Sequence, residues 1–121
     1  MSANRNWIKY GAALGFIAVA MGAFGAHAFK DILTEHYAGV YNTASKYALV
    51  HAVLLVALAL CPNISIPRSI FIALVVGIAI FSGTLWGLAI FQIKWLGAIT
   101  PIGGLCLLFA WARLGWWGWR I

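Results

Sequence analysis

Side chains able to do chemistry are few in this chain, and most of them stand inside long apolar stretches. Hydroxyl groups occur there at Ser82, Thr84 and Thr100. Histidine can ligate a metal or a haem iron, or carry a proton. The histidines are His27, His36 and His51. Because polar groups are costly in apolar surroundings, the positions of these residues are the best indication of a site.

The histidines favour a structural interpretation. A buried histidine in a helix bundle most often hydrogen-bonds to a neighbouring hydroxyl or carbonyl group, so we expect this role for His51. Proton transfer, ligand contact and metal or haem binding are the alternatives. Haem would need two facing histidines, and His27 with His51 is the only intramembrane pair. We expect His36 at the membrane surface. No spacing typical of a metal site joins the three, so we predict no metal ion and no cofactor.

Catalytic signatures are absent from the sequence. It contains no Ser-His-Asp set, no paired carboxylates within an apolar run, no phosphate-binding loop and no CxxC motif. We expect Cys61 and Cys106 to be packing residues rather than a disulfide framework. We therefore predict no catalytic residues and no enzymatic activity.

The elements that carry the polar residues follow from the composition. Of the 121 residues, 64% are hydrophobic and 8% are charged, whereas about a quarter of the residues of a soluble domain are charged. The chain therefore has too little polar surface to be soluble, and we predict an integral membrane protein. The net charge of +6 favours membrane orientation over nucleic-acid binding, because no basic stripe alternates with exposed aromatic residues.

Four apolar runs are long enough to cross a membrane. A helix needs about 20 residues to span a hydrocarbon core of about 30 Å. The runs cover residues 8–29, 44–61, 70–91 and 95–116. They lack the polar alternation that a membrane barrel requires. We predict an all-α fold, a four-helix bundle that forms a single transmembrane domain over residues 1–121.

The connection between the first two runs has a pattern of its own. From residue 29 to residue 42, the less polar side chains recur at helical spacing and the charged ones fall largely on the other side. This pattern predicts a short amphipathic helix lying in the membrane surface, with a plain loop as the alternative. The less polar face comprises Phe29, Ile32, Leu33, His36, Tyr37, Val40 and Tyr41.

The start of the chain also has features of a secretory signal, because Arg5 and Lys9 precede an apolar stretch that ends at Ala26-His27-Ala28. The apolar run of about 20 residues is longer than a typical signal core. Its small residues are also spaced for helix packing. We therefore expect the first span to be retained.

Basic residues are distributed unequally between the two sides of the predicted membrane domain. The side of the termini carries Arg5, Lys9, Arg68, Arg113 and Arg120, and the opposite side carries Lys30, Lys46 and Lys94. Both acidic residues, Asp31 and Glu35, lie on the opposite side. Because positive charge is enriched in cytoplasmic segments, we predict a multi-pass protein of the cell or inner membrane with cytoplasmic termini. In a eukaryote we expect a mitochondrial membrane instead.

The rare polar residues gather in one half of the bilayer when the four helices alternate in direction. At a rise of about 1.5 Å per residue, they fall in the half away from the termini, termed here the outer half. Thr100-Pro101 would free a helical carbonyl group near Leu96 or Gly97, and the glycines that follow would let a helix or ligand approach. We therefore predict a ligand or partner pocket in the outer half. Its lining is His27, His51, Ser82, Thr84, Trp86, Thr100, Pro101, Gly103 and Gly104.

Small residues recur every four positions in the first and third runs, a spacing that lets helices approach closely. In the first run they are Gly11 and Gly15, followed by Ala18, Gly22 and Ala26, and in the third run they are Ala79, Gly83 and Gly87. Closing the monomer is the favoured role of these faces, and a dimer interface is the alternative.

Four segments, in this order, resemble those of a known family. They are Gly22-Ala23-Phe24-Gly25-Ala26-His27-Ala28, Thr43-Ala44 with Tyr47 and His51, Phe81-Ser82-Gly83-Thr84-Leu85, and Thr100-Pro101-Ile102-Gly103-Gly104. Over nearly the whole chain, the sequence is similar to the YgdD-like family, also termed the transmembrane protein 256 family or domain of unknown function 423. Thr84 and Trp86 stand where that family more commonly carries Ser and Tyr. The resemblance implies a compact four-helix membrane protein of bacteria or mitochondria, and it implies no particular activity.

Together these features predict a structural or accessory membrane protein whose outer-half pocket binds a lipid, a quinone-like molecule or a partner helix. One alternative is a transporter or channel component with a polar path through His27 and His51, and another is a haem or metal protein. The expected partners are membrane lipids, with a larger membrane complex or further copies of the chain as other candidates. We expect no nucleic acid.

Overall fold

The computed structural model describes residues 3–121, which form a short 3-10 helix and four long α-helices. The 3-10 helix η1 spans Ala3–Trp7, and the α-helices are α1 (Ile8–His27), α2 (Glu35–Ala59), α3 (Arg68–Phe91) and α4 (Leu96–Arg120). The described residues contain no strand. All four α-helices are long and apolar enough to cross a membrane. The predicted all-α architecture of four membrane helices is therefore confirmed.

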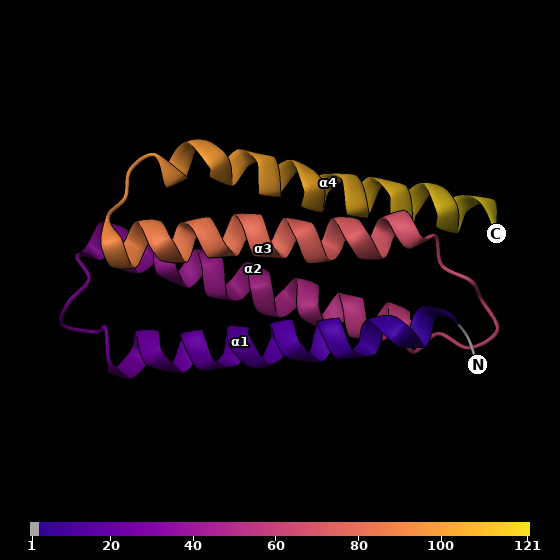
Figure 1. Ribbon diagram of the computed structural model, residues 1–121, viewed down its shortest axis with the longest axis horizontal. Coiled ribbons are helices and arrows are strands. Elements are labelled where there is room, and N and C mark those ends of the chain that lie inside the picture. Colours follow the sequence, from indigo (N-terminus) through magenta and orange to yellow (C-terminus); the bar gives the residue numbers. More distant parts are fainter. Residues whose placement is uncertain (1–2) are drawn as a thin grey trace.

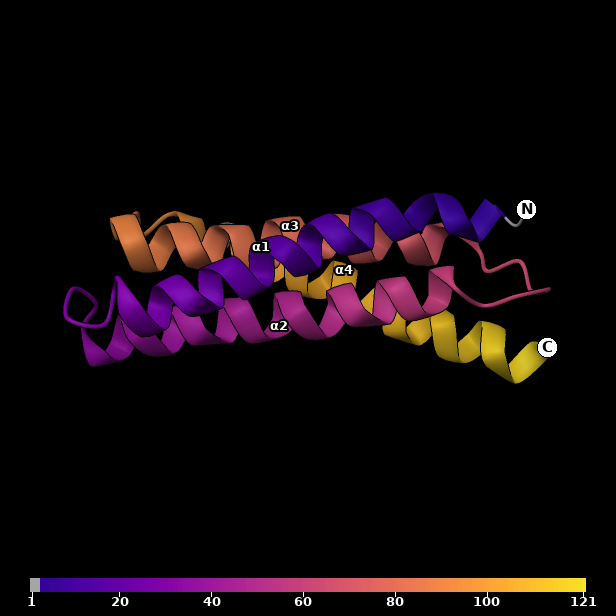
Figure 2. The ribbon, with the colours of Figure 1, turned by 90° about the horizontal axis from the view of Figure 1, so that it is seen from below.

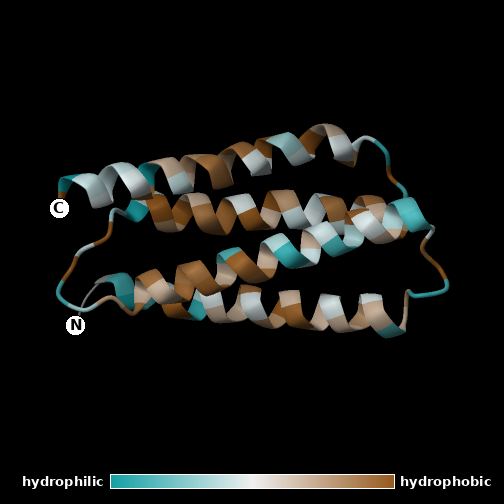
Figure 3. Cartoon of the chain, turned by 180° about the vertical axis from the view of Figure 1, so that it is seen from behind, coloured by the Kyte–Doolittle hydropathy of each residue, from teal (hydrophilic) through white to brown (hydrophobic). Residues whose placement is uncertain are grey.

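The four helices lie in an antiparallel row, in which each helix packs on the next one along the chain (Figure 1). Figure 2 shows that the helices are inclined to one another: near the termini α1 and α3 lie on one side and α2 and α4 on the other, whereas at the opposite end α1 lies beside α2 and α4 beside α3. Both termini and the α2–α3 connection lie at one end, termed here the termini end. The α1–α2 and α3–α4 connections lie at the opposite end, the loop end. Hydrophilic residues gather at both ends and continue into the part of α2 nearer the loop end (Figure 3).

α2 begins earlier than the sequence predicts. Residues 35–42 are helical, but they form the first two turns of α2, which runs unbroken from Glu35 to Ala59. Thr34 caps this start, since its Oγ1 accepts a hydrogen bond of 3.3 Å from the Tyr37 N–H. No proline separates the amphipathic residues from the apolar run, so nothing ends the helix between them. The separate surface helix that we expected here is therefore the start of α2 itself.

The other helix boundaries lie within a few residues of the predicted ones. Pro62 and Pro67 stand in the α2–α3 connection, where Asn63 adopts a left-handed conformation with φ 60°. α3 ends at Phe91, and its C-cap residue Gln92, which is also left-handed with φ 55°, turns the chain into α4. α4 extends to Arg120, beyond the predicted end at residue 116.

The core lies between α3 and the face of α2 that packs on it. α2 contributes mainly alanines and α3 contributes larger side chains, a pairing that lets the two helices approach closely. The buried residues include Ala44, Ala48, Ala52 and Ala59 on α2 and Ile70, Phe71, Leu74 and Ile78 on α3. In α1 only Gly11 and Ala18 are buried. α1 is therefore the helix most exposed to its surroundings.

Candidate functional site

Ser82 joins α3 to α2 in the outer half. Its side chain is fully buried, and its Oγ donates a hydrogen bond of 2.7 Å to the carbonyl oxygen of Ala44. Because Ala44 carries only a methyl group, the α3 hydroxyl can reach the α2 backbone. The hydroxyl proton is used in this contact between helices.

Thr84 and Thr100 form a hydroxyl pair between α3 and α4, with 2.7 Å between their Oγ1 atoms. Thr84 Oγ1 also lies 2.6 Å from the Ile80 carbonyl oxygen, and Thr100 Oγ1 lies 3.0 Å from that of Leu96. Each hydroxyl has one proton, so one threonine donates to the other, which donates to its own helix. Pro101 follows at an exposed position inside α4, which remains continuous.

Trp86 extends the polar contacts from α3 towards α1. Its Nε1 donates a hydrogen bond of 3.0 Å to Ser45 Oγ, which donates at 3.2 Å to the carbonyl oxygen of Tyr41. The Tyr41 hydroxyl in turn donates to the carbonyl oxygen of Met21 in α1. These side chains connect three helices without leaving an unused donor among them.

His51 of α2 is held between two partners. Its Nδ1 lies 2.7 Å from the carbonyl oxygen of Tyr47, and its Nε2 lies 3.0 Å from Nε1 of Trp111 in α4. Because the indole N–H can only donate, Nε2 accepts, and in the neutral ring Nδ1 carries the proton and donates to Tyr47. A metal or haem iron at Nε2 would have to displace the Trp111 N–H. This geometry supports a structural role for His51.

The structure separates His27 and His51, the two histidines that the haem alternative would need to face one another. His51 lies about 16 residues after the start of α2, or about 24 Å from the loop end. Trp111 lies at a similar depth in α4, so this pair belongs to the half nearer the termini. His27 is exposed at the loop end, where α1 ends. The depth argument placed His51 in the outer half because it started the second helix at residue 44.

Gly103 marks a very close approach of α4 to α3. A Cβ atom built on Gly103 would lie 2.8 Å from the Cα atom of Phe81 and closer still to the Phe81 backbone nitrogen. At Gly104 the same atom would lie 3.6 Å from the Phe81 ring, an ordinary contact. Gly103 therefore serves contact between two helix backbones, and a ligand has no room at this point.

The small residues predicted to pack helices fall into two groups. Gly11 and Gly15 face α2 and Gly87 faces α4, where an added Cβ atom would meet side-chain atoms at 2.6 Å, 3.8 Å and 2.8 Å, respectively. The second group faces open space or is exposed. It comprises Gly22, Ala26 and Gly83. The repeated spacing of small residues thus closes the monomer at only some of its positions.

Two residues that the sequence pattern did not indicate hold the ends of α1. The Tyr41 ring lies over Gly25, where a Cβ atom would lie 2.9 Å from ring carbon Cδ1. At the termini end, Asn4 is 2% exposed. Its Nδ2 donates to the Ile64 carbonyl oxygen at 2.6 Å, and its Oδ1 accepts from the Ile66 N–H at 3.2 Å. A hydrogen bond to a main-chain atom cannot be recognised from residue types, because every residue offers the same main-chain groups. The one sequence signal for the Tyr41 contact is Gly25, which lies one turn after Met21.

An apolar groove lies between α1 and α2. It has a volume of about 390 Å³ and opens on the outer surface, since Ala12, Val53 and Leu60 on its walls are exposed. Its other lining residues are Gly11, Gly15, Ala52, Val56 and Ala57. A second cavity lies at the termini end. Ser82, Thr84 and Thr100 line neither of them.

The part of the chain that the structure describes contains no cluster of possible metal ligands. Within residues 3–121, no three His, Cys, Asp or Glu side chains lie close enough together to hold a metal ion. His51 does line a small cavity of about 110 Å³, which it shares with Lys46, Tyr47 and Val50. That cavity offers one imidazole, whose ring nitrogens already have partners.

The fold and its hydrogen-bonded helix contacts define a small four-helix integral membrane protein. A family model described as "Protein of unknown function (DUF423)" matches residues 21–104. The chain therefore belongs to the DUF423 family.

Curated relatives agree with this assignment. The UPF0382 membrane protein of Staphylococcus epidermidis is 39% identical over 113 residues, covering 89% of this chain and 90% of that protein. The UPF0382 membrane protein YwdK of Bacillus subtilis is 38% identical, with 89% and 91% covered. The UPF0382 inner membrane protein YgdD of Escherichia coli is 37% identical, with 92% and 87% covered. No solved structure matches the chain.

Proposed function

We propose that the protein is a non-catalytic accessory membrane protein that holds an acyl chain of a membrane lipid in the groove between α1 and α2. The groove itself is the observation that carries this proposal, because it is apolar and opens sideways from the bundle. Hydrocarbon surrounds a membrane-spanning helix. An open groove at that depth is therefore filled by an acyl chain unless a partner helix takes its place.

The polar side chains support an accessory role over transport. A proton path through His27 and His51 would need the two residues to be near one another, yet His51 lies about 24 Å from the loop end, where His27 stands. The hydroxyl groups of Ser82, Thr84 and Thr100 bond to helix carbonyls or to each other. These residues stabilise helix contacts, which is why we place the lipid in the groove and not in an outer-half pocket.

Filling the groove tests the proposal. A Cβ atom at Gly15 would meet only Ala52, at 3.8 Å, so the longer side chain of Gly15→Leu would project into the groove. Gly22 lies on the same helix outside the groove, and a Cβ atom there meets nothing within 4 Å, so Gly22→Leu is the matched control. Phospholipid that remains bound after purification in a mild detergent is quantified by mass spectrometry.

We expect the wild type and Gly22→Leu to retain similar amounts of lipid and Gly15→Leu to lose most of it. Melting temperatures of all three show whether the fold is kept. Retention of lipid by Gly15→Leu, or equal loss from both variants, would contradict the proposal. A wild type that carries no lipid but co-purifies with a protein that Gly15→Leu releases would favour a partner helix instead.

We also propose that the chain lies in the inner membrane with both termini in the cytoplasm. The five basic residues on the side of the termini support this orientation, and one relative is named an inner membrane protein. A reporter that is active only in the cytoplasm, fused after Ile121, should be active. A periplasmic reporter at the same position should be inactive, and the opposite result would reverse the orientation.

A further inference from the structure

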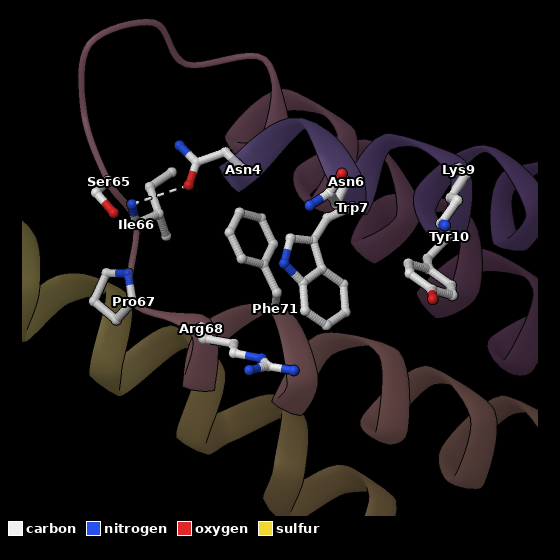
Figure 4. A pocket seen from close by; sticks show the side chains of 10 residues that line it. All are labelled: Asn4, Asn6, Trp7, Lys9, Tyr10, Ser65, Ile66, Pro67, Arg68 and Phe71. Carbon is white, nitrogen blue, oxygen red and sulfur yellow. Dashed lines mark hydrogen bonds between the residues drawn. The ribbon is translucent and has the colours of Figure 1, made fainter. Parts of the chain in front are cut away.

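A cavity of about 720 Å³ lies at the termini end, between the start of α1 and the start of α3 (Figure 4). One wall consists of η1 and the first turn of α1, and the other consists of the α2–α3 connection and the first turn of α3. Because it lies where membrane-spanning helices begin, it stands at the depth of the lipid headgroups. It is separate from the polar residues of the outer half.

The side chains that line the cavity include two cations and no anion. Lys9 and Arg68 line opposite walls, and both are exposed. The only acidic residues of the chain, Asp31 and Glu35, lie in the α1–α2 connection and at the start of α2, at the loop end. No Asp or Glu can therefore reach the cavity to neutralise its two cations.

The two walls are joined by specific contacts. The Asn4 amide bonds to main-chain atoms of Ile64 and Ile66. Beside it, the rings of Trp7 and Phe71 stack with centroids 5.3 Å apart and planes 8° apart. Figure 4 shows these residues between the segments that they connect. The cavity is consequently part of the folded structure and does not depend on an accidental gap between chain ends.

Further groups suit an anion at this position. α3 begins at Arg68, and its N-cap Pro67 makes no side-chain capping bond. The Ile70 N–H donates to the Pro67 carbonyl oxygen at 3.1 Å, so the N–H groups of Arg68 and Ser69 are the ones left for an anion. A helix N-terminus also carries a partial positive charge that favours anions. Trp7 and Tyr10 in the lining are residue types enriched at the membrane interface. In Figure 4 the Arg68 side chain extends below the Trp7 ring.

We propose that this cavity binds the phosphate-bearing headgroup of an anionic phospholipid, with Lys9 and Arg68 as its charge partners. This inference goes beyond the proposed function, because Lys9 and Tyr10 at the cavity project from a different face of α1 than Gly11, Ala12 and Gly15 at the groove. The headgroup depth of the cavity favours a lipid over free phosphate.

The test compares which lipid is bound by variants that differ in one charge. Wild type, Lys9→Gln, Arg68→Gln and the double variant are incubated with equal amounts of phosphatidylglycerol and phosphatidylcholine in mixed micelles. The ratio of the two bound lipids is read by native mass spectrometry. Arg120→Gln is the matched control, because Arg120 lies at the same end outside the cavity, near the Trp116 ring. Arg68→Lys keeps the charge.

Each basic group near a membrane surface is worth about a factor of five in attraction to anionic lipid. We therefore expect each single substitution to lower the bound ratio of phosphatidylglycerol to phosphatidylcholine about fivefold, and the double variant about 25-fold. Arg68→Lys should stay near the wild type, and Arg120→Gln should change the ratio less than twofold. If Arg120→Gln lowered the lipid ratio as much as Arg68→Gln does, diffuse surface charge would explain the preference, and the proposal would be overturned.

Two controls distinguish headgroup binding from binding of free phosphate and from occupancy of the groove alone. The first control measures thermal stability in millimolar inorganic phosphate and in chloride at equal ionic strength. If phosphate stabilises the protein and no preference between the two lipids is found, the cavity binds free phosphate and the lipid assignment is overturned. Gly15→Leu should lower the total amount of bound lipid without lowering the ratio of phosphatidylglycerol to phosphatidylcholine, whereas the charge variants should lower that ratio. Failure of the proposed function and failure of this inference therefore give different results.

Discussion

Gly103 in the α3–α4 contact and Gly15 in the α1–α2 contact differ in how closely they bring the two helices together. At Gly103, α4 touches the backbone of α3 at Phe81. At Gly15, α1 faces only the Ala52 side chain, and a groove of about 390 Å³ remains beside it. The difference shows that a glycine closes a helix contact only where the partner presents backbone or a large side chain. Where small faces small, space remains for another molecule.

Substitution at Gly103 is the strongest test of this comparison. A methyl group there would lie 2.8 Å from the Phe81 Cα atom, and neither backbone can give way without shifting its helix. We expect Gly103→Ala to lower the free energy of unfolding by about 3 kcal/mol, the upper part of the range for overpacking. The measurement is reversible unfolding in mixed micelles with increasing denaturing detergent.

The adjacent glycine provides the control. At Gly104 the added methyl group would make an ordinary contact of 3.6 Å with the Phe81 ring. Gly104→Ala should therefore change stability by less than about 0.5 kcal/mol, as does a substitution away from special features. Equal destabilisation by the two variants would contradict the role of the close contact, because helix propensity favours alanine over glycine at both positions.

The α1 side depends more on polar contacts at its ends. Asn4→Ala would remove two hydrogen bonds and leave the Ile66 N–H without its acceptor, which costs about 2 kcal/mol. Asn6→Ala, at an exposed neighbouring position, should have little effect. Because the loss concerns one edge of the row, hydrogen exchange should increase in α1 and in the α2–α3 connection. An increase spread evenly over α3 and α4 would contradict this division of the molecule.

The sequence predicted the elements better than the depth of their residues. Four spans, three connections and an all-α fold follow from apolar runs and from breakers such as Pro62 and Pro67, since both signals are local. The start of α2 does not follow from these signals, because the amphipathic segment and the apolar run are joined without a helix-breaking residue. Moving that start from residue 44 to Glu35 shifts His51 into the half of the membrane nearer the termini.

The candidate site shows a similar limit. Composition singled out Ser82, Thr84 and Thr100 correctly as polar exceptions, and the structure gives each of them a hydrogen-bond partner. Which partner each has depends on helix rotation, and a residue pattern does not specify it. The groove and the termini-end cavity escaped prediction because a cavity is defined by what neighbouring helices fail to fill.

The hydrogen bond between His51 and Trp111 provides a third contact to compare, because it links α2 to α4, which are not successive helices. Loss of either partner leaves a polar group in an apolar region. A double-mutant cycle with His51→Ala and Trp111→Phe should give a coupling free energy of about 1 kcal/mol, within the range for hydrogen bonds between membrane helices. A haem spectrum or bound metal in the purified wild type, lost in His51→Ala, would contradict the structural role.

The smallest effect is expected for the threonine pair of the tight interface. Thr84 and Thr100 each have an alternative acceptor in their own helix, at Ile80 and Leu96. Losing the bond between the hydroxyl groups therefore leaves neither group unsatisfied. A cycle with Thr84→Val and Thr100→Val should yield a coupling of about 0.6 kcal/mol, the average for such pairs. A coupling as large as the effect of Gly103→Ala would mean that hydrogen bonding, and not backbone contact at the glycine, holds α3 and α4 together.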